Sequence, residues 1–153
     1  MNHAQHETTR ISRLALQATT HCLTGCGIGE VLGLAGGTAL GLSNAVTVVL
    51  GIVLAYAFGY GLTLVPLLRA AMPLLRATGI TFAAETLSIT TMEIVDNLVV
   101  LAIPGAMDAG LADALFWASL AISLALAFVA AFPVNRWLIA RGLGHAVVHG
   151  AHH

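Results

Sequence analysis

Four long apolar stretches alternate with short polar connections along this chain. A helix needs about 20 mostly apolar residues to cross a bilayer, and each stretch reaches that length. We predict membrane spans at residues 16–40, 43–65, 80–103 and 114–139. The pattern therefore predicts an all-α protein, a single-domain integral membrane four-helix bundle whose second connection could form a short interfacial helix.

Arginine placement predicts the orientation of this bundle. Every basic residue is an arginine, and with four spans all of them fall on one side of the membrane: Arg10, Arg13, Arg69, Arg76, Arg136 and Arg141. Positively charged segments stay in the cytoplasm, so we expect both termini to be cytoplasmic. The expected location is the cytoplasmic (inner) membrane, with several passes.

Composition narrows the classes of function. Hydrophobic residues make up 58% of the chain and charged residues 8%, against about 25% charged residues in soluble domains. The expected partner is the lipid bilayer. No basic block is present, which argues against nucleic acid. Two cysteines are too few for a disulfide scaffold.

Small residues recur every fourth position on the first two predicted spans. The first carries Gly25, Gly29, Gly33, Gly37 and Gly41, and the second carries Gly51, Ala55 and Gly59. Glycine at this period leaves a groove in which a second helix backbone can approach closely. Either these two helices pack together, or the groove is a subunit interface in a homo-oligomer.

Ionisable side chains inside two spans are the candidate functional residues. Each costs roughly 2.5–3.5 kcal/mol in hydrocarbon, so such groups usually face an interior. The first span carries His21, Cys22, Cys26 and Glu30, and the third carries Glu85, Met92, Glu93 and Asp96, with Asn97 beside them.

These residues sort into two levels if the first and third helices are neighbours. Both helices run from inside to outside, so depth can be counted from their starts. The cytoplasmic level would hold His21, Cys22, Cys26 and Glu85, and the mid-membrane level would hold Glu30, Met92, Glu93, Asp96 and Asn97.

The donor set is typical of a transition-metal site. Thiolate, imidazole and thioether suit copper(I) and zinc, and carboxylates extend the set toward harder ions. We therefore predict a membrane protein that binds copper(I) or zinc and transports it through this interior. His145 and His149 are possible accessory ligands, since histidines four apart share a helix face. The tail could also have no role.

Other interpretations stay open. The carboxylates could relay protons or another cation, with the cysteines incidental. A membrane redox enzyme could use the thiols or a bound metal, although the pattern favours a non-enzyme. Cysteines also pack as small apolar residues, and Glu93, Asp96 and Asn97 could form a structural hydrogen-bond network.

Three segments carry a resemblance to a known family. They are residues 21–30, 85–97 and 132–137. They resemble a family of small bacterial four-helix membrane proteins catalogued as a domain of unknown function. The likeness covers nearly the whole chain and implies the same architecture. Copper-related labels on some members imply copper as the metal.

Overall fold

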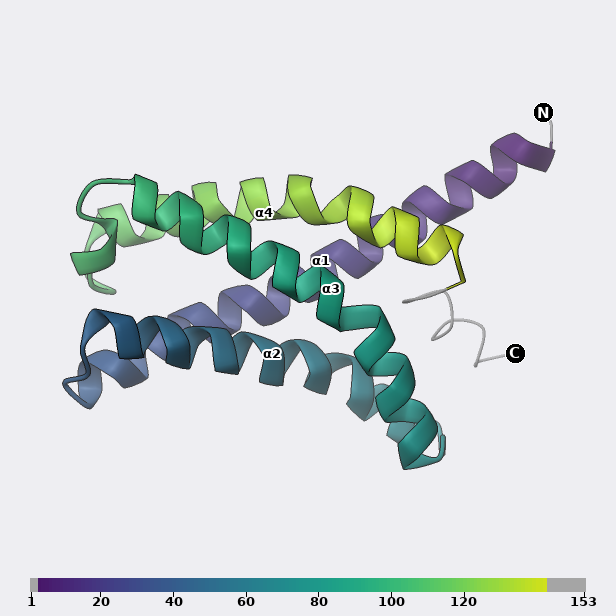
Figure 1. Ribbon diagram of the computed structural model, residues 1–153, viewed down its shortest axis with the longest axis horizontal. Helices are drawn as coiled ribbons and strands as arrows, with labels where there is room; N and C mark the ends of the chain where they lie inside the picture. The colour runs from purple at the N-terminus through teal and green to yellow at the C-terminus, as the bar shows by residue number, and fades with distance from the viewer. Residues whose placement is uncertain (1–2, 143–153) are drawn as a thin grey trace.

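The computed structural model describes residues 3–142 and places four α-helices and one short 3-10 helix there (Figure 1). The helices are α1 (His3–Ala39), α2 (Asn44–Arg69), α3 (Leu74–Ala102) and α4 (Ala114–Ala140), with η1 (Ala106–Asp108) between α3 and α4. No strand occurs among these residues, so the all-α prediction is confirmed.

The helices extend beyond the predicted spans. α1 begins at His3, well before the predicted start at residue 16. α3 begins at Leu74, immediately after Pro73, so the second connection is a turn and contains no separate interfacial helix. The proline has a fixed backbone angle that suits the start of a helix, which explains why the chain turns directly into α3.

The helices form two antiparallel hairpins, α1–α2 and α3–α4, which pack against each other (Figure 1). The α1–α2 turn and the loop containing η1 lie at one end of the bundle. The start of α1, the α2–α3 turn and the end of α4 lie at the other end. We call the second the arginine end, because all the arginines belong to these segments.

The outer surface of the bundle is apolar. α2 and α4 are each long and apolar enough to cross a membrane, and only 22% and 28% of their most apolar windows are buried. Large side chains stand on the surface, among them Val53 at 58% exposed and Val129 at 69%. Helices buried in a soluble core would hide these side chains, so their exposure favours lipid contact.

The glycine groove of α1 is filled by α2. Gly25 lies against Gly59, and a Cβ atom added there would stand 2.8 Å from the Gly59 Cα. Along the same groove, Gly29 meets Ala55, Gly33 meets Gly51 and Gly37 meets Thr47. Of the two interpretations of the small-residue period, the structure therefore shows packing within one chain. Gly41, with φ 64°, lies in the turn after α1.

Two sets of polar contacts fasten the remaining helices. The Asn135 amide on α4 donates to the hydroxyls of Thr19 on α1 and Ser88 on α3, each at 2.9 Å. Between α2 and α3, the hydroxyls of Tyr56 and Thr90 lie 2.6 Å apart, and those of Tyr60 and Thr86 lie 2.7 Å apart. These contacts fix the rotation of α3, which carries most of the candidate site.

We expect Gly29→Val to destabilise the bundle, because any side chain at Gly29 would overlap the backbone of Ala55. Overpacking of this kind costs about 1–3 kcal/mol. The matched control is Gly61→Val on α2, where an added Cβ meets no atom within 4 Å. Thermal unfolding in detergent compares the two, and equal melting temperatures would contradict the close packing.

Candidate functional site

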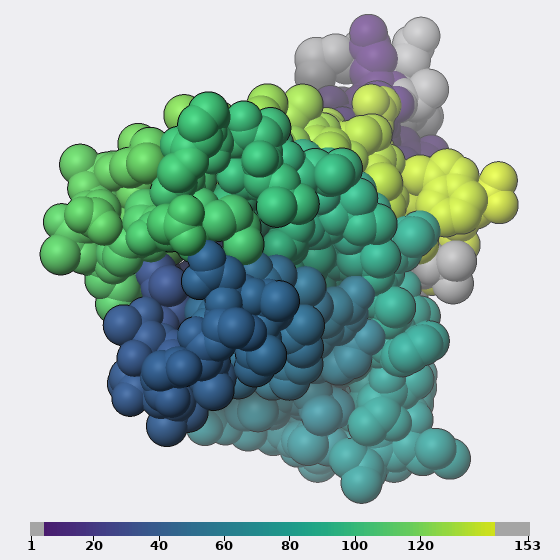
Figure 2. Space-filling view, turned by 60° about the vertical axis from the view of Figure 1, so that its left-hand side comes forward, coloured from purple at the N-terminus to yellow at the C-terminus, as the bar shows by residue number. Residues whose placement is uncertain are grey.

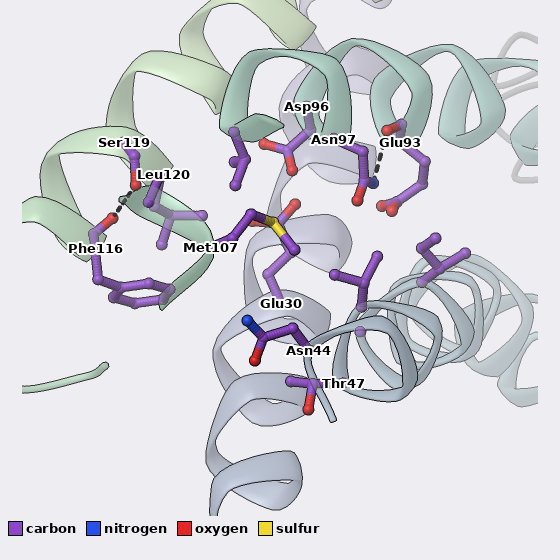
Figure 3. A pocket seen from close by; sticks show the side chains of 15 residues that line it. Glu30, Asn44, Thr47, Glu93, Asp96, Asn97, Met107, Phe116, Ser119 and Leu120 are labelled. Atoms are coloured by element: carbon purple, nitrogen blue, oxygen red, sulfur yellow. Dashed lines mark hydrogen bonds between the residues drawn. The ribbon is translucent and has the colours of Figure 1, made fainter. Parts of the chain in front are cut away.

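A cavity of about 110 Å³ lies between the helices toward the arginine-free end (Figure 3). Its lining comes from all four helices and from η1, and it includes the polar residues Glu30, Asn44, Thr47, Glu93, Asp96, Asn97 and Ser119. Figure 2 views this end, where the two hairpins meet along a seam. A water molecule takes about 30 Å³ of liquid, so the cavity has room for a small ion with a few waters.

Three carboxyl groups face this cavity. Glu93 is 6% exposed and Asp96 is 4% exposed, both on α3, and Glu30 reaches it from α1 (Figure 3). Within residues 3–142, one oxygen of Glu30, one of Asp96 and both of Glu93 are buried without a hydrogen-bond partner. An unpaired buried carboxylate is costly. These three groups therefore call for a cation or for bound protons.

Helix geometry explains why they meet. Glu93 and Asp96 are three positions apart, so they lie on one face of α3. α1 runs parallel to α3, and Glu30 lies at the depth where it interacts with both Asp96 and Glu93. Asn97 joins them at the cavity, and its amide donates to the Glu93 backbone carbonyl at 2.8 Å. Four of the five residues predicted at the mid-membrane level thus line one cavity.

A second polar cluster lies nearer the arginine end, and we call it the Glu85 cluster: His21, Cys22, Thr63 and Glu85. The Cys22 thiol donates to Glu85 Oε2 at 2.9 Å. The Thr63 hydroxyl donates to Glu85 Oε1 at 2.6 Å and lies 3.1 Å from His21 Nε2. Both carboxylate oxygens of Glu85 therefore have hydrogen bonds from protein groups, unlike those of Glu93.

The sequence reasoning missed Thr63. Threonine is neither acidic nor basic and is not a usual metal ligand, so it did not stand out among the polar residues of the spans. A usable signal was present, because Thr63 continues the series Gly51, Ala55 and Gly59 by one turn, and all four are buried. A hydroxyl on the packed face of a membrane helix needs a partner, and here it finds one in Glu85.

A packed layer of mostly apolar side chains lies between the cavity and the Glu85 cluster, and Cys22 of that cluster belongs to the same packed group. Cys26, Ile89 and Met92 are at most 1% exposed and pack together with Ala55, Ala127 and Ala131. The Ile89 side chain fits against Gly59, where any Cβ would collide with it. Cys26 interacts electrostatically with Glu93 and so borders the cavity. Met92, predicted at the mid-membrane level, belongs to this packed layer.

Within residues 3–142, no three His, Cys, Asp or Glu side chains converge closely enough to hold a metal ion. A metal at the cavity would thus need the carboxylates to rotate toward it. The predicted metal role of these residues stays a prediction. His145 and His149 lie outside the described residues.

The two kinds of carboxylate should differ in their effect on stability. We expect Glu93→Gln and Asp96→Asn to raise the melting temperature of metal-free protein, because each removes the cost of burying a carboxylate oxygen that has no hydrogen-bond partner or of keeping that carboxyl protonated. Glu85→Gln should lower it, since an amide nitrogen cannot accept the hydrogen bond it would face, at a cost of about 1–3 kcal/mol. If all three variants lower the melting temperature equally, the distinction between the paired Glu85 and the unpaired cavity carboxyls is wrong.

A family model described as a domain of unknown function, DUF4396, matches residues 13–144. The match covers most of the chain, so the protein belongs to this family. No curated protein and no solved structure matches it.

Proposed function

We propose that this member of the DUF4396 family is an integral membrane protein that binds a transition-metal ion in the cavity and passes it across the membrane. The observation that carries the proposal is the group of three buried carboxyls with unpartnered oxygens around one cavity. A bound cation would offset their burial and mutual repulsion. A transported ion must also be released. The carboxylates therefore need not already be arranged around it as they would be in a tight-binding site.

The proposal includes four membrane spans. α1 and α3 contain the ionisable groups and are less apolar than α2 and α4, but their outer faces carry exposed apolar side chains. Examples are Leu32 at 45% on α1, and Phe82 at 64% and Leu101 at 65% on α3. The thiols of α1 and the carboxyls of α3 are buried, as intramembrane ionisable residues usually are.

Orientation follows from the arginines. With the arginine end in the cytoplasm, both termini are inside and the cavity lies nearer the opposite face of the membrane. We place the protein in a bacterial inner membrane. A homo-oligomer remains part of the proposal, but the glycine groove does not supply its interface, because α2 already fills that groove.

The donors around the cavity favour zinc over copper(I). Carboxylate oxygens from Glu30, Glu93 and Asp96 with the Cys26 thiol beside them make a mixed oxygen and sulfur set, which zinc accepts. Copper(I) prefers thiolates and thioethers, whereas three of the four side chains in this set are carboxyls. The Glu85 cluster is not assigned to the metal, since both Glu85 oxygens already accept hydrogen bonds.

Zinc titration of the purified full-length protein by calorimetry tests the proposal. We expect the triple variant Glu30→Gln, Glu93→Gln, Asp96→Asn to lose at least about tenfold in zinc affinity, since even outer-shell changes weaken metal sites by 10–100-fold. Cys26→Ala should weaken it less. Glu7→Gln, an exposed position on α1, is the control. Unchanged affinity in the triple variant would refute the site.

Labelling with a membrane-impermeant maleimide tests the four-span arrangement. Cysteine at Ser43 or Ala112, which are exposed at the arginine-free end, should react in intact cells. Cysteine at Ala70, in the α2–α3 turn, should react only after the membrane is opened. Cys22 and Cys26 are buried and give little background. Labelling of Ala70→Cys in intact cells would contradict the orientation.

A further inference from the structure

The Glu85 cluster has a different chemistry from the cavity. Glu85 is 0% exposed, yet its two oxygens accept hydrogen bonds from Cys22 and Thr63. In the cavity, by contrast, both oxygens of Glu93 and one oxygen each of Glu30 and Asp96 have no hydrogen-bond partner within residues 3–142. A buried carboxylate with two donors is stable without a metal ion. The Glu85 cluster therefore does not require the metal ion that is proposed for the cavity.

The hydrogen bonds of the cluster have a direction. Thr63 has a single hydroxyl hydrogen, and it points to Glu85 Oε1. With Glu85 charged, the Thr63 oxygen is left to accept a hydrogen bond from His21 Nε2, 3.1 Å away, when that nitrogen carries the proton. His21 is partly exposed, whereas Thr63 is 4% exposed. A chain of donors therefore leads from a partly exposed imidazole to a fully buried carboxylate.

We infer that Glu85 is a proton-binding site, separate from the cation cavity and loaded from the arginine end through His21 and Thr63. One proton moves from His21 to Glu85, and Thr63 gains one proton and gives up another. The His21 imidazolium gives its Nε2 proton to the Thr63 oxygen, while Thr63 gives its hydroxyl hydrogen to Glu85 Oε1. His21 is left neutral with its proton on Nδ1, the threonine is again a hydroxyl, and Glu85 is a neutral acid.

The Cys22 thiol supports this exchange as a positioning group. It donates to Glu85 Oε2, the oxygen that does not face Thr63. The carboxylate is thereby held with Oε1 toward the relay, and it keeps one hydrogen bond in both its charged and neutral forms. Glu85 can therefore lose its proton again without being left wholly unpaired.

The apolar layer of Cys26, Ile89 and Met92 keeps the proton site apart from the cavity. The inference rests on the proposed function and extends it, because it supplies a proton that can be exchanged for the metal ion. A cation in the cavity and a proton on Glu85 repel one another across a medium of low dielectric constant. Arrival of the metal then favours release of the proton, which is the basis of exchange between the two ions.

Proton movement into liposomes containing the full-length protein tests the inference. A pH gradient is imposed, an internal dye reports pH, and each protein is measured once with zinc and once with chelator. We expect wild type to move protons in at least one condition. Thr63→Val, which keeps the shape but removes the hydroxyl, should lower the rate by about tenfold or more, as loss of a proton-transfer group typically does. Glu85→Gln should do the same.

The matched control is Thr63→Ser, which restores the hydroxyl and loses only a methyl group. It should move protons nearly as fast as wild type, whereas a purely structural role for Thr63 would make the two substitutions similar. Zinc titration of Thr63→Val checks that its cavity is intact. The inference is overturned if wild type moves no protons in either condition, if Thr63→Val and Glu85→Gln match wild type, or if Thr63→Ser is as slow as Thr63→Val.

The two proposals fail separately. Relay-dependent proton movement in protein that does not bind zinc would refute the metal cavity and leave the proton site standing. Zinc binding that depends on Glu93 and Asp96, without proton movement, would refute the proton site and leave the metal cavity standing.

Discussion

Burial of carboxyl groups inside an apolar bundle is the constraint on which this structure depends. Lipid cannot solvate a charge, so each such group must find a partner within the protein or bind an ion. Glu85 meets this requirement with a thiol and a hydroxyl. Glu30, Glu93 and Asp96 have buried oxygens that do not meet it among the described residues. Glu85 is therefore paired within the fold, whereas Glu30, Glu93 and Asp96 have oxygens available to an ion.

Glycine packing sets the distances on which both sites rely. Contact between Gly25 and Gly59 brings the backbones of α1 and α2 together. Thr63, one turn beyond Gly59, is thereby placed within reach of both His21 and Glu85. Larger residues on this face would move α2 outward and leave Glu85 with one donor fewer. The same contact leaves space at Gly59 for Ile89, which helps to close the layer between the sites.

In the proposed transport, the apolar layer would close the path between the two sites. The cavity lies toward the arginine-free end, and the Glu85 cluster lies toward the arginine end. Ions could therefore reach each site from a different side, and passage between them would require Ile89 and Met92 to move. Asn135 and the tyrosine–threonine contacts tie α3 to its neighbours, so such movement would involve rotation of whole helices rather than single side chains.

The sequence alone determined the helices and identified the acidic residues that line the cavity. Apolar length predicted the helices, because it depends on local geometry. The period of four predicted a close helix contact, but it left open whether the contact lies within one chain or between subunits. Equal depth on parallel helices placed Glu30 beside Asp96, again from local geometry. The sequence could not assign the polar residues to two separate sites, decide whether Met92 packs or binds a metal, or identify Thr63. Those outcomes depend on how α2 and α3 are rotated about their axes, and only contacts between distant segments fix that rotation.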